Sequence, residues 1–275
     1  MADARVFDGT VLIVGGGAMG GSIARGLVSS GALAPSQVLV ADPSPSVRED
    51  LVADAGVTTF PDASEALALD PQVVLFAVKP QVLDSVVTPV ADQVADRLVV
   101  SIAAGVPLAH LQEVVGAKAR VIRVMPNLPV AVRKGACAIA PGENATTQDA
   151  SLVRTLLSSL GSAAVMREDQ LDVEGAVVGC GPAFFALMVD ALTRAGVEAG
   201  LPAATCRDLV RETMGGVAEM LADGTHPRAF MERVTSPGGT TAAALRAMEP
   251  LLQEACYEAV DAAMAKTYEL AEGCR

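Results

Sequence analysis

The chain contains 275 residues, 51% of them hydrophobic, so it is long and apolar enough to bury a core and is not intrinsically disordered. Its 20 basic and 32 acidic residues give a net charge of −12, which repels nucleic-acid backbones. Aromatic residues make up only 3%, so side chains on which bases stack are scarce. We therefore expect no nucleic-acid partner.

The most apolar stretch of the sequence is too short to span a membrane. It covers residues 175–189, contains Pro182, and falls short of the roughly 18 to 20 residues that a bilayer requires. The first residues carry Asp3, Arg5 and Asp8 and lack the apolar region of a signal peptide. The five cysteines form no CxxC pair, which favours neither disulfides nor a zinc site. We expect a cytoplasmic protein without a transmembrane helix, a membrane partner or a metal.

Valine-rich apolar runs alternate with helical patterns up to about residue 166. This alternation is typical of βαβ units, in which a parallel sheet is covered by helices on both faces. The predicted strands, in chain order, are Thr10–Val14, Gln37–Ala41, Val57–Thr59, Val73–Val78, Leu98–Ala103, Arg120–Met125, Cys137–Ala140 and Ala163–Met166.

Beyond about residue 170 the strand signal disappears, and four helical patterns follow, separated by glycine- and proline-containing segments at 200–202, 224–227 and 236–239. The segment Phe184–Ala195 is apolar on more than one face and requires cover from a second subunit. The predicted fold is therefore α/β: an N-terminal Rossmann-like, doubly wound parallel sheet over residues 1–168, then an all-helical dimerisation and substrate-binding domain over residues 169–275.

The first predicted strand runs directly into Gly15-Gly16-Gly17-Ala18-Met19-Gly20, a G-x-G-x-x-G motif followed by a helical pattern over Ser22–Ser29. In a dinucleotide site the first glycine makes a tight turn, the second admits a pyrophosphate, and the third packs helix against strand. The helix start then holds the anion. We predict a dinucleotide site here, the alternative being a glycine-rich turn without a ligand.

Asp42 ends the second predicted strand, about 20 residues beyond the glycine motif, where an acidic residue bonds the adenosine ribose. Its charge repels a 2′-phosphate, which favours NADH over NADPH. In the alternative interpretation Asp42 only begins the turn Asp42-Pro43-Ser44. Arg48, one turn further on, would offset the repulsion.

Two further kinds of segment are predicted to bind ligands. Ligands bind beyond the carboxyl ends of parallel strands, so the strand exits Ala77–Pro80, Ala103–Gly105 and Met125–Asn127 are expected to line the cofactor groove. The segment Thr235–Thr241 places two glycines and several hydroxyls before a helical pattern over Ala242–Met248, an arrangement suited to a carboxylate. Its alternative interpretation is a helix cap and turn.

The two histidines, His110 and His226, are predicted to be surface residues. The sequence indicates no histidine paired with a carboxylate, no Ser-His-Asp set and no acidic metal cluster. A mechanism that relies on a strong general acid is therefore disfavoured.

Taken together, six motifs resemble pyrroline-5-carboxylate reductase, in register over nearly the whole chain. They are the glycine motif, Ala77-Val78-Lys79-Pro80-Gln81-Val82-Leu83, Ser101-Ile102-Ala103-Ala104-Gly105, Arg123-Val124-Met125-Pro126-Asn127, Gly181-Pro182-Ala183 and Thr235-Ser236-Pro237-Gly238-Gly239-Thr240-Thr241. The resemblance implies that NADH or NADPH reduces 1-pyrroline-5-carboxylate to L-proline, the last step of proline biosynthesis. It also implies homodimers that can associate into decamers.

The same resemblance implies roles for individual residues. Ser236, Gly238, Gly239 and Thr240 would hold the substrate carboxylate, and Thr241 would bond the ring nitrogen as the catalytic hydroxyl. The cofactor would contact the glycine motif and the strand exits, at Gly15, Gly17, Ala18, Met19, Gly20, Asp42, Ala77, Val78, Lys79, Pro80, Ala103, Ala104, Gly105 and Asn127.

Several positions depart from the pattern of this family. They include Val178, Cys180, Phe184 and Leu128, as well as Ala41-Asp42-Pro43 and the residues around Pro250-Leu251-Leu252. One alternative function is therefore a related imine or hydroxyacid dehydrogenase, although Gly181–Ala191 lacks the catalytic lysine of the hydroxyacid enzymes. The other is a nucleotide-binding regulator without catalysis, against which the presence of Thr241 argues.

Overall fold

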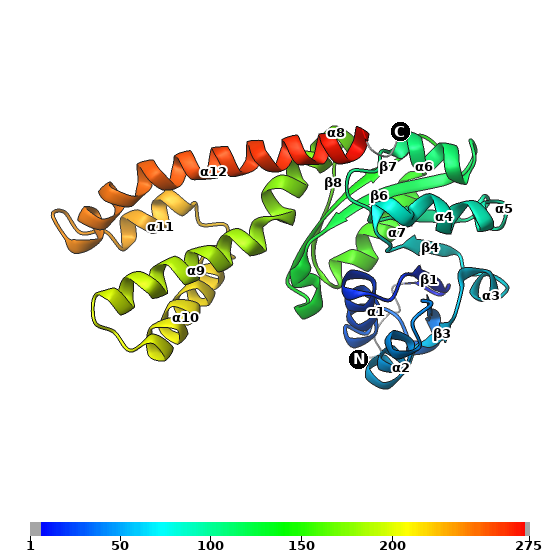
Figure 1. Cartoon of the computed structure of the whole chain (residues 1–275), viewed down its shortest axis with the longest axis horizontal. Coiled ribbons are helices and arrows are strands. Elements are labelled where there is room, and N and C mark those ends of the chain that lie inside the picture. Colours follow the sequence, from blue (N-terminus) through cyan, green and yellow to red (C-terminus); the bar gives the residue numbers. More distant parts are fainter. Residues whose placement is uncertain (1–6, 273–275) are drawn as a thin grey trace. The chain divides into compact units, whose positions relative to one another are not determined.

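The computed structural model describes residues 7–272, and the chain divides into two compact units (Figure 1). The first contains the chain up to Cys180 together with the part from Ala263 onward, and the second is Gly181–Ala262. The functional boundary expected between residues 168 and 169 remains a prediction.

The first unit is built on an eight-stranded sheet with the order β3-β2-β1-β4-β5-β6-β7-β8. Every strand expected from the sequence forms, with ends shifted by a few residues. The strands are β1 (Val11–Val14), β2 (Val38–Ala41), β3 (Thr58–Phe60), β4 (Val73–Phe76), β5 (Leu98–Ser101), β6 (Arg120–Pro126), β7 (Gly135–Pro141) and β8 (Gly161–Val165). The Rossmann-like α/β class predicted from the sequence is confirmed.

The expectation of a wholly parallel sheet is wrong at one pair, because β6 and β7 run antiparallel. The connection between them, from Pro126 to Gly135, contains only the short 3-10 helix η4 (Leu128–Val132). A parallel crossover needs about a dozen residues or more, so this connection must reverse the chain. All other neighbouring strands pair in parallel.

Helices cover both faces of this sheet, as the buried runs of the strands require (Figure 1). Alternate residues of β1 point to opposite faces: Val11 and Ile13 pack in one core, and Leu12 and Val14 pack in the other. The first core takes side chains from α1 (Ala18–Ser29), α2 (Pro45–Ala55) and α7 (Thr147–Ser158). The second takes them from α3 (Ala63–Leu67), α4 (Leu83–Val87), α5 (Ala91–Val94) and α6 (Leu108–Val115).

In the first unit, the sheet is followed by a continuous run of α8 (Glu168–Glu174) and the π-helix η5 (Gly175–Gly179). Leu171 of α8 packs against Met125 and Ala138 in a third, smaller core. In η5 the Cys180 N–H donates to the Gly175 carbonyl, and single π turns of this kind are frequent at functional sites.

The second unit is helical, and no strand occurs beyond Val165 among the residues that the structure describes. Its helices are α9 (Gly181–Glu198), α10 (Ala203–Leu221), α11 (Pro227–Arg233) and α12 (Thr240–Glu272), which continues past Ala262. They end and begin at the glycine- and proline-containing segments noted in the sequence. Helix α12 is much longer than the Ala242–Met248 pattern and contains Pro250 in its interior.

Helix α9 exposes large apolar side chains. This agrees with the apolar pattern of Phe184–Ala195, whose faces cannot all be covered within one chain. Phe185 is 65% exposed and Leu187 66% exposed. The continuous helical stretch Glu168–Glu198 is mostly unburied, and by length and composition alone it is long and apolar enough to cross a membrane. It extends beyond the apolar run at 175–189 because the helix continues through Glu174 and Asp190, the charged residues that bound that run. Pro182 does not interrupt it, since it lies in the first turn of α9, where proline is tolerated. The expected absence of a membrane partner stays a prediction.

Candidate active site

The glycine motif has the geometry of a pyrophosphate-binding turn. Gly15 has φ +102°, and a Cβ there would lie 2.6 Å from the Ala77 carbonyl oxygen. A Cβ on Gly20 would lie 1.9 Å from the Gly15 carbonyl oxygen, so only glycine permits this approach of helix to strand. Gly17 has no atom within 4 Å of its Cβ position, which leaves open space at the start of α1. The three glycines therefore fit the three roles that a dinucleotide site requires.

A cavity of about 640 Å³ lies at the carboxyl ends of the strands beside this turn. Six residues predicted to contact the cofactor line it: Gly15, Gly17, Asp42, Ala77, Val78 and Lys79. Apolar side chains from the segment after β4, including Val82, Val86 and Val90, form much of the remaining wall. This is the edge at which ligands bind in doubly wound sheets.

Sequence reasoning missed the part of the cavity wall that follows β3, which includes Pro61, Asp62 and Ser64. The Asp62 carboxylate accepts the Glu65 N–H and caps α3. An aspartate three residues before a glutamate, shortly after a strand, is the signal that would have revealed this helix start. Because β3 is the parallel neighbour of β2, its carboxyl end reaches the same edge of the sheet as Asp42.

Asp42 ties the end of β2 to the glycine motif. Its Oδ2 accepts the Gly16 N–H at 2.8 Å, and its Oδ1 accepts the Ser44 N–H at 2.9 Å. The bond from Gly16 places the carboxylate beside the glycine turn. The bond from Ser44 closes the turn Asp42-Pro43-Ser44, which is the alternative role considered for Asp42. The Arg48 guanidinium donates to the Asp42 backbone carbonyl at 2.7 Å, so a cation also lies at this strand end.

The other predicted cofactor contacts occupy neighbouring elements. Ala18, Met19 and Gly20 form the first turn of α1, and Pro80 opens the 3-10 helix η2 (Pro80–Val82). Ala103, Ala104 and Gly105 follow β5, and Asn127 follows β6. None of these eight residues lines the cavity described above.

Asn127 has a clear structural task. It is buried, its Oδ1 accepts the Ala136 N–H at 2.8 Å, and its Nδ2 donates to the Val178 carbonyl at 3.2 Å. Its side chain therefore joins the start of β7 to the π-helix η5. A contact to the cofactor would have to use the second N–H of the amide, and the binding role of Asn127 remains a prediction.

A half-buried acidic side chain that the sequence gave no reason to single out lies at the end of α8, before η5. Glu174 is half-buried, its Oε2 has no hydrogen-bond partner among the described residues, and burial raises the pKa of its carboxyl to about 7. Burial, with the charge of Glu174 as a smaller cause, also raises the pKa of the Cys137 thiol to about 12. Cys137 is therefore protonated at neutral pH and is not a nucleophile.

The expectation that no histidine is paired with a carboxylate is wrong. His110 Nε2 lies 2.8 Å from Asp84 Oδ1, which joins α6 to α4. The two residues are 26 positions apart in the sequence, so only the packing of these helices brings them together. His226 is exposed, as expected, and its Nδ1 accepts the Arg228 N–H to cap α11.

In the second unit, the residues predicted to bind the substrate all lie at one helix start. Gly238 has φ +72°, the Gly239 N–H donates to the Ser236 carbonyl, and α12 begins at Thr240. The loop thus presents the free N–H groups of a helix start beside the hydroxyls of Ser236, Thr240 and Thr241. This arrangement suits a carboxylate.

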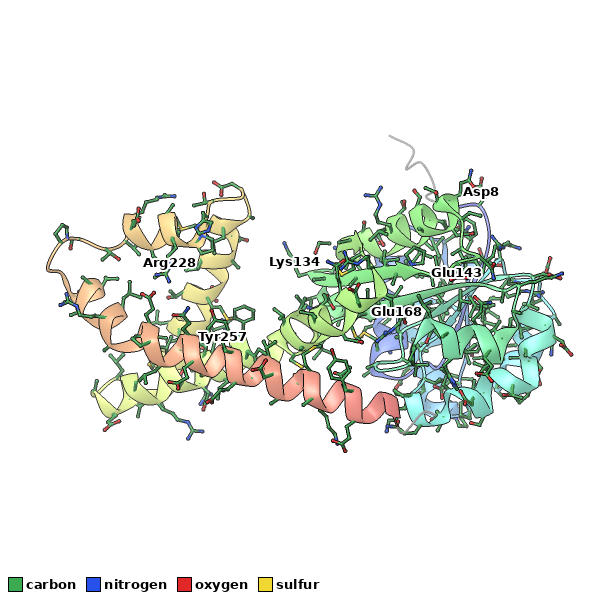
Figure 2. All side chains as sticks on the ribbon, turned by 90° about the horizontal axis from the view of Figure 1, so that it is seen from above. Asp8, Lys134, Glu143, Glu168, Arg228 and Tyr257 are labelled. Carbon is green, nitrogen blue, oxygen red and sulfur yellow. The ribbon has the colours of Figure 1, made fainter. Side chains whose placement is uncertain are left out.

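An ion pair holds the two helices that flank this loop. Arg228 of α11, labelled in Figure 2, pairs with Glu249 of α12. The pair raises the pKa of Arg228 and lowers that of Glu249, through the hydrogen bond between them. Both side chains are exposed, so we assign the pair a positioning task and no large share of stability.

Comparisons with known proteins give one match for the Rossmann-like part of the chain and another for the helical part. Residues 168–270 match the sequence model of the family described as pyrroline-5-carboxylate reductase dimerisation, and residues 10–105 match that of NADP oxidoreductase, coenzyme F420-dependent. The curated pyrroline-5-carboxylate reductase of Arabidopsis thaliana is 38% identical over 262 residues, covering 94% of each chain. The chain belongs to the pyrroline-5-carboxylate reductase family. The resemblance seen in the sequence is therefore confirmed.

Solved structures of pyrroline-5-carboxylate reductases have the same fold. The structure from Coxiella burnetii is 30% identical, with a TM-score of 0.90 over 96% of this chain and 99% of that chain. The Plasmodium falciparum enzyme, solved with NADP bound, is 27% identical, with a TM-score of 0.85 over 96% of this chain and 98% of that chain. The family to which this chain belongs thus consists of NAD(P)-dependent oxidoreductases.

Proposed function

We propose that this chain reduces the C=N bond of 1-pyrroline-5-carboxylate to give L-proline, with NADH or NADPH, in the final step of proline biosynthesis. The observation that carries the proposal is the glycine turn of the first unit, whose shape at Gly15, Gly17 and Gly20 fits a dinucleotide pyrophosphate. The second observation is the helix start at Thr240 in the second unit, which suits the carboxylate of the substrate. The dinucleotide domain is proposed to span residues 1–168 and the helical domain residues 169–275.

The proposed chemistry is mostly orientation of two ligands. When bound, the reduced nicotinamide supplies a hydride to the imine carbon. Ser236, Gly238, Gly239 and Thr240 hold the substrate carboxylate through backbone N–H groups and hydroxyls, which fixes the ring. The Thr241 hydroxyl bonds the ring nitrogen, which takes its proton from solvent or from this hydroxyl. No histidine is needed for these steps.

The proposed cofactor contacts are those of the glycine motif and the strand exits. The pyrophosphate meets the start of α1, where N–H groups and the positive end of the helix dipole favour an anion. The full set is Gly15, Gly17, Ala18, Met19, Gly20, Asp42, Ala77, Val78, Lys79, Pro80, Ala103, Ala104, Gly105 and Asn127.

We infer that the coenzyme preferred by this chain is NADH. Asp42 and Asp62 both line the cavity beside the glycine turn, and their charges oppose the 2′-phosphate of NADPH by about 1 to 3 kcal/mol in a partly screened site. Arg48 acts in the opposite direction, because its guanidinium lies at the same strand end. Catalytic efficiencies measured with both coenzymes test this, and a clear preference for NADPH refutes the role of Asp42.

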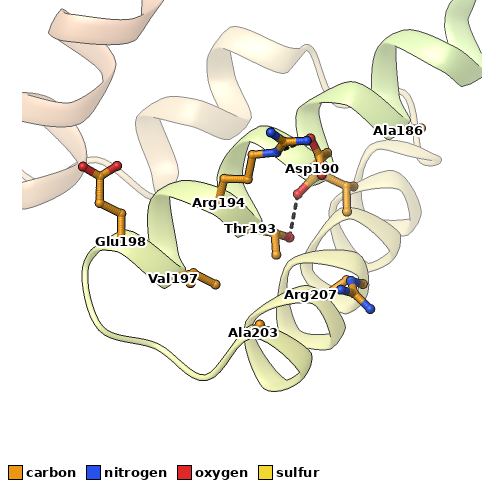
Figure 3. Close-up of a pocket in the computed structure, with 9 residues that line it drawn as sticks. Ala186, Asp190, Thr193, Arg194, Val197, Glu198, Ala203 and Arg207 are labelled. Carbon is orange, nitrogen blue, oxygen red and sulfur yellow. Dashed lines mark hydrogen bonds and ion pairs between the residues drawn. The ribbon is translucent and has the colours of Figure 1, made fainter.

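The second unit is matched by a dimerisation family, which indicates self-association. We propose a homodimer at least, with a decamer as its possible higher assembly. A groove of about 500 Å³ between α9 and α10 adds to the exposed apolar surface of α9 (Figure 3). Its wall includes Val189 and Val197 and the Asp190–Arg194 ion pair of α9. Sedimentation that gives a folded, active monomer refutes the obligate dimer.

The remaining partners proposed for the enzyme follow from its chemistry. It takes a small soluble substrate, and its net charge of −12 opposes nucleic-acid binding. A cytoplasmic location and the absence of a membrane partner are part of the same proposal. Fractionation of cells that express the full chain tests them.

The deciding experiment is a coenzyme-oxidation assay with 1-pyrroline-5-carboxylate beside its six-membered homologue and an open-chain keto acid. Fastest turnover of the five-membered imine supports the proposal. Faster turnover of another substrate would place the chain among related imine or hydroxyacid dehydrogenases. Coenzyme binding without any turnover would make it a nucleotide-binding regulator.

A further inference from the structure

A buried arginine joins three elements of the first unit. Arg123 lies in β6 with its side chain 3% exposed. Its Nη1 is 3.3 Å from Glu168 Oε1, and its Nη2 is 2.5 Å from Asp172 Oδ1. The two carboxylates lie one turn apart on α8 and so face the same side of that helix. A buried guanidinium requires such partners, because an unpaired charge in the interior is strongly unfavourable.

One of these carboxylates has a second bond that the ion pair does not explain. Glu168 Oε1 also accepts the Leu108 N–H at 2.6 Å, across 60 residues of sequence. Leu108 is the first residue of α6, and the N-cap residue, Pro107, provides no side-chain bond. The start of α6 is therefore capped by a side chain from α8, and Glu168 is labelled in Figure 2.

The capped N–H stands at the end of the segment that leaves β5, residues 103–107. At its beginning the Ala103 N–H donates to the hydroxyl of Ser101, which is fully buried. Gly105 has φ +73°, and Val106 is buried. Both ends of the segment are thus fixed, one by the sheet and the other by Glu168. This segment contains the residues 103–105 that the proposed function assigns to the cofactor.

We propose that Glu168, held in place by Arg123, is a positioning residue that fixes segment 103–107 in the conformation the coenzyme binds. The proposal rests on the proposed function, since it needs that segment to contact the coenzyme. A preformed wall costs no ordering when the coenzyme binds, whereas a loose segment loses conformational freedom at that step. A purely structural ion pair would affect only unfolding.

The same strand offers a matched control at its first residue, Arg120. Arg120 Nη1 lies 2.5 Å from Asp149 Oδ1, and Asp149 is nearly buried on α7. This pair joins the first residue of β6, at the amino end of that strand, to a helix, and Asp149 Oδ2 also accepts the Thr146 N–H in the cap of α7. Asp149→Asn therefore disturbs a similar ion pair without touching the proposed function.

Two substitutions separate the reach of Glu168 from its charge. Glu168→Asp keeps the negative charge facing Arg123 but withdraws the carboxylate by one methylene, away from the Leu108 N–H. Glu168→Gln keeps the reach and the acceptor but removes the charge. We expect Glu168→Asp to raise the dissociation constant of the better-bound coenzyme about 5- to 10-fold, with Glu168→Gln and Asp149→Asn staying within about 2-fold. Fluorescence titration measures binding, and a denaturant curve measures unfolding for each variant.

Hydrogen exchange of the amides of residues 103–106 and 108 in the wild-type enzyme is the second measurement, and it decides the matter if Glu168→Asp does not fold. Coenzyme is expected to slow exchange across the segment. The proposal is overturned if Glu168→Asp binds coenzyme like wild type and only its unfolding midpoint moves, or if coenzyme leaves this exchange unchanged. Wild-type protein that binds the coenzyme but does not reduce the imine contradicts the proposed reaction alone. Wild-type protein that binds neither coenzyme overturns both.

Discussion

Replacing Glu174 with glutamine is expected to make the protein more stable at alkaline pH and to leave it little changed at acid pH. Glu174 is half-buried and its Oε2 has no partner among the described residues, so burial raises the pKa of its carboxyl from 4.5 to about 7. Glutamine has nearly the same shape but no charge at any pH. The perturbation therefore removes the ionisation and little else.

The sign follows from where the proton is bound. Between pH 4.5 and about 7 the folded protein holds the Glu174 proton and the unfolded chain does not, so the free energy of unfolding falls as pH rises through this window. Below pH 4.5 both states are protonated, and above about pH 7 the full penalty is present. The shift corresponds to roughly 3 kcal/mol at most, because a half-buried carboxylate keeps part of its hydration.

The assay is urea unfolding of wild type and Glu174→Gln at several pH values from 5 to 8, at one protein concentration and without coenzyme. We expect the difference in unfolding free energy to grow in favour of the variant as pH rises, by about 1 to 3 kcal/mol across the window. Glu143→Gln, at an exposed position of the same unit, is the control and should give a constant difference. Parallel curves for wild type and Glu174→Gln would refute the assignment of a half-buried carboxyl that keeps its proton up to about pH 7.

Three further predictions concern the candidate site and the buried thiol. Thr241→Val should lower turnover about 100-fold with little change in coenzyme affinity, whereas a residue that only caps the helix would lose about 1 kcal/mol of stability and keep near-normal turnover. The Cβ of Gly17→Ala meets open space, so this variant should fold normally while binding coenzyme at least 10-fold more weakly, as a binding titration will show. Gly20→Ala forces a Cβ to 1.9 Å from a backbone oxygen, so this variant should unfold at a much lower urea concentration. Cys137, whose thiol pKa is raised to about 12, should resist a thiol reagent at pH 8 that labels the exposed Cys256, and equal labelling of the two in folded protein would contradict its burial.

The local pattern of the sequence was enough to predict the strands and the glycine turn. Apolar valine runs such as Val11–Val14 can only be buried on both faces of a sheet, so their positions were predictable without the structure. Gly15 and Gly20 are required by contacts within one strand–turn–helix unit and its neighbouring strand, and spacing alone revealed them. The motif Ser236–Thr241 likewise indicated the family from the sequence, because its residues are consecutive.

Other features depend on contacts between distant residues, and no local pattern encodes such contacts. The direction of β7 depends on whether its connection can cross the sheet, and the pairing of His110 with Asp84 depends on how α4 and α6 pack. Glu168 and Leu108 are joined across 60 residues, and nothing near either one indicates the bond. Sequence thus determined which segments are buried and which turn has the shape for a dinucleotide. The tertiary structure decided which charged groups are buried with them, because burial and pairing depend on every element packed around a site.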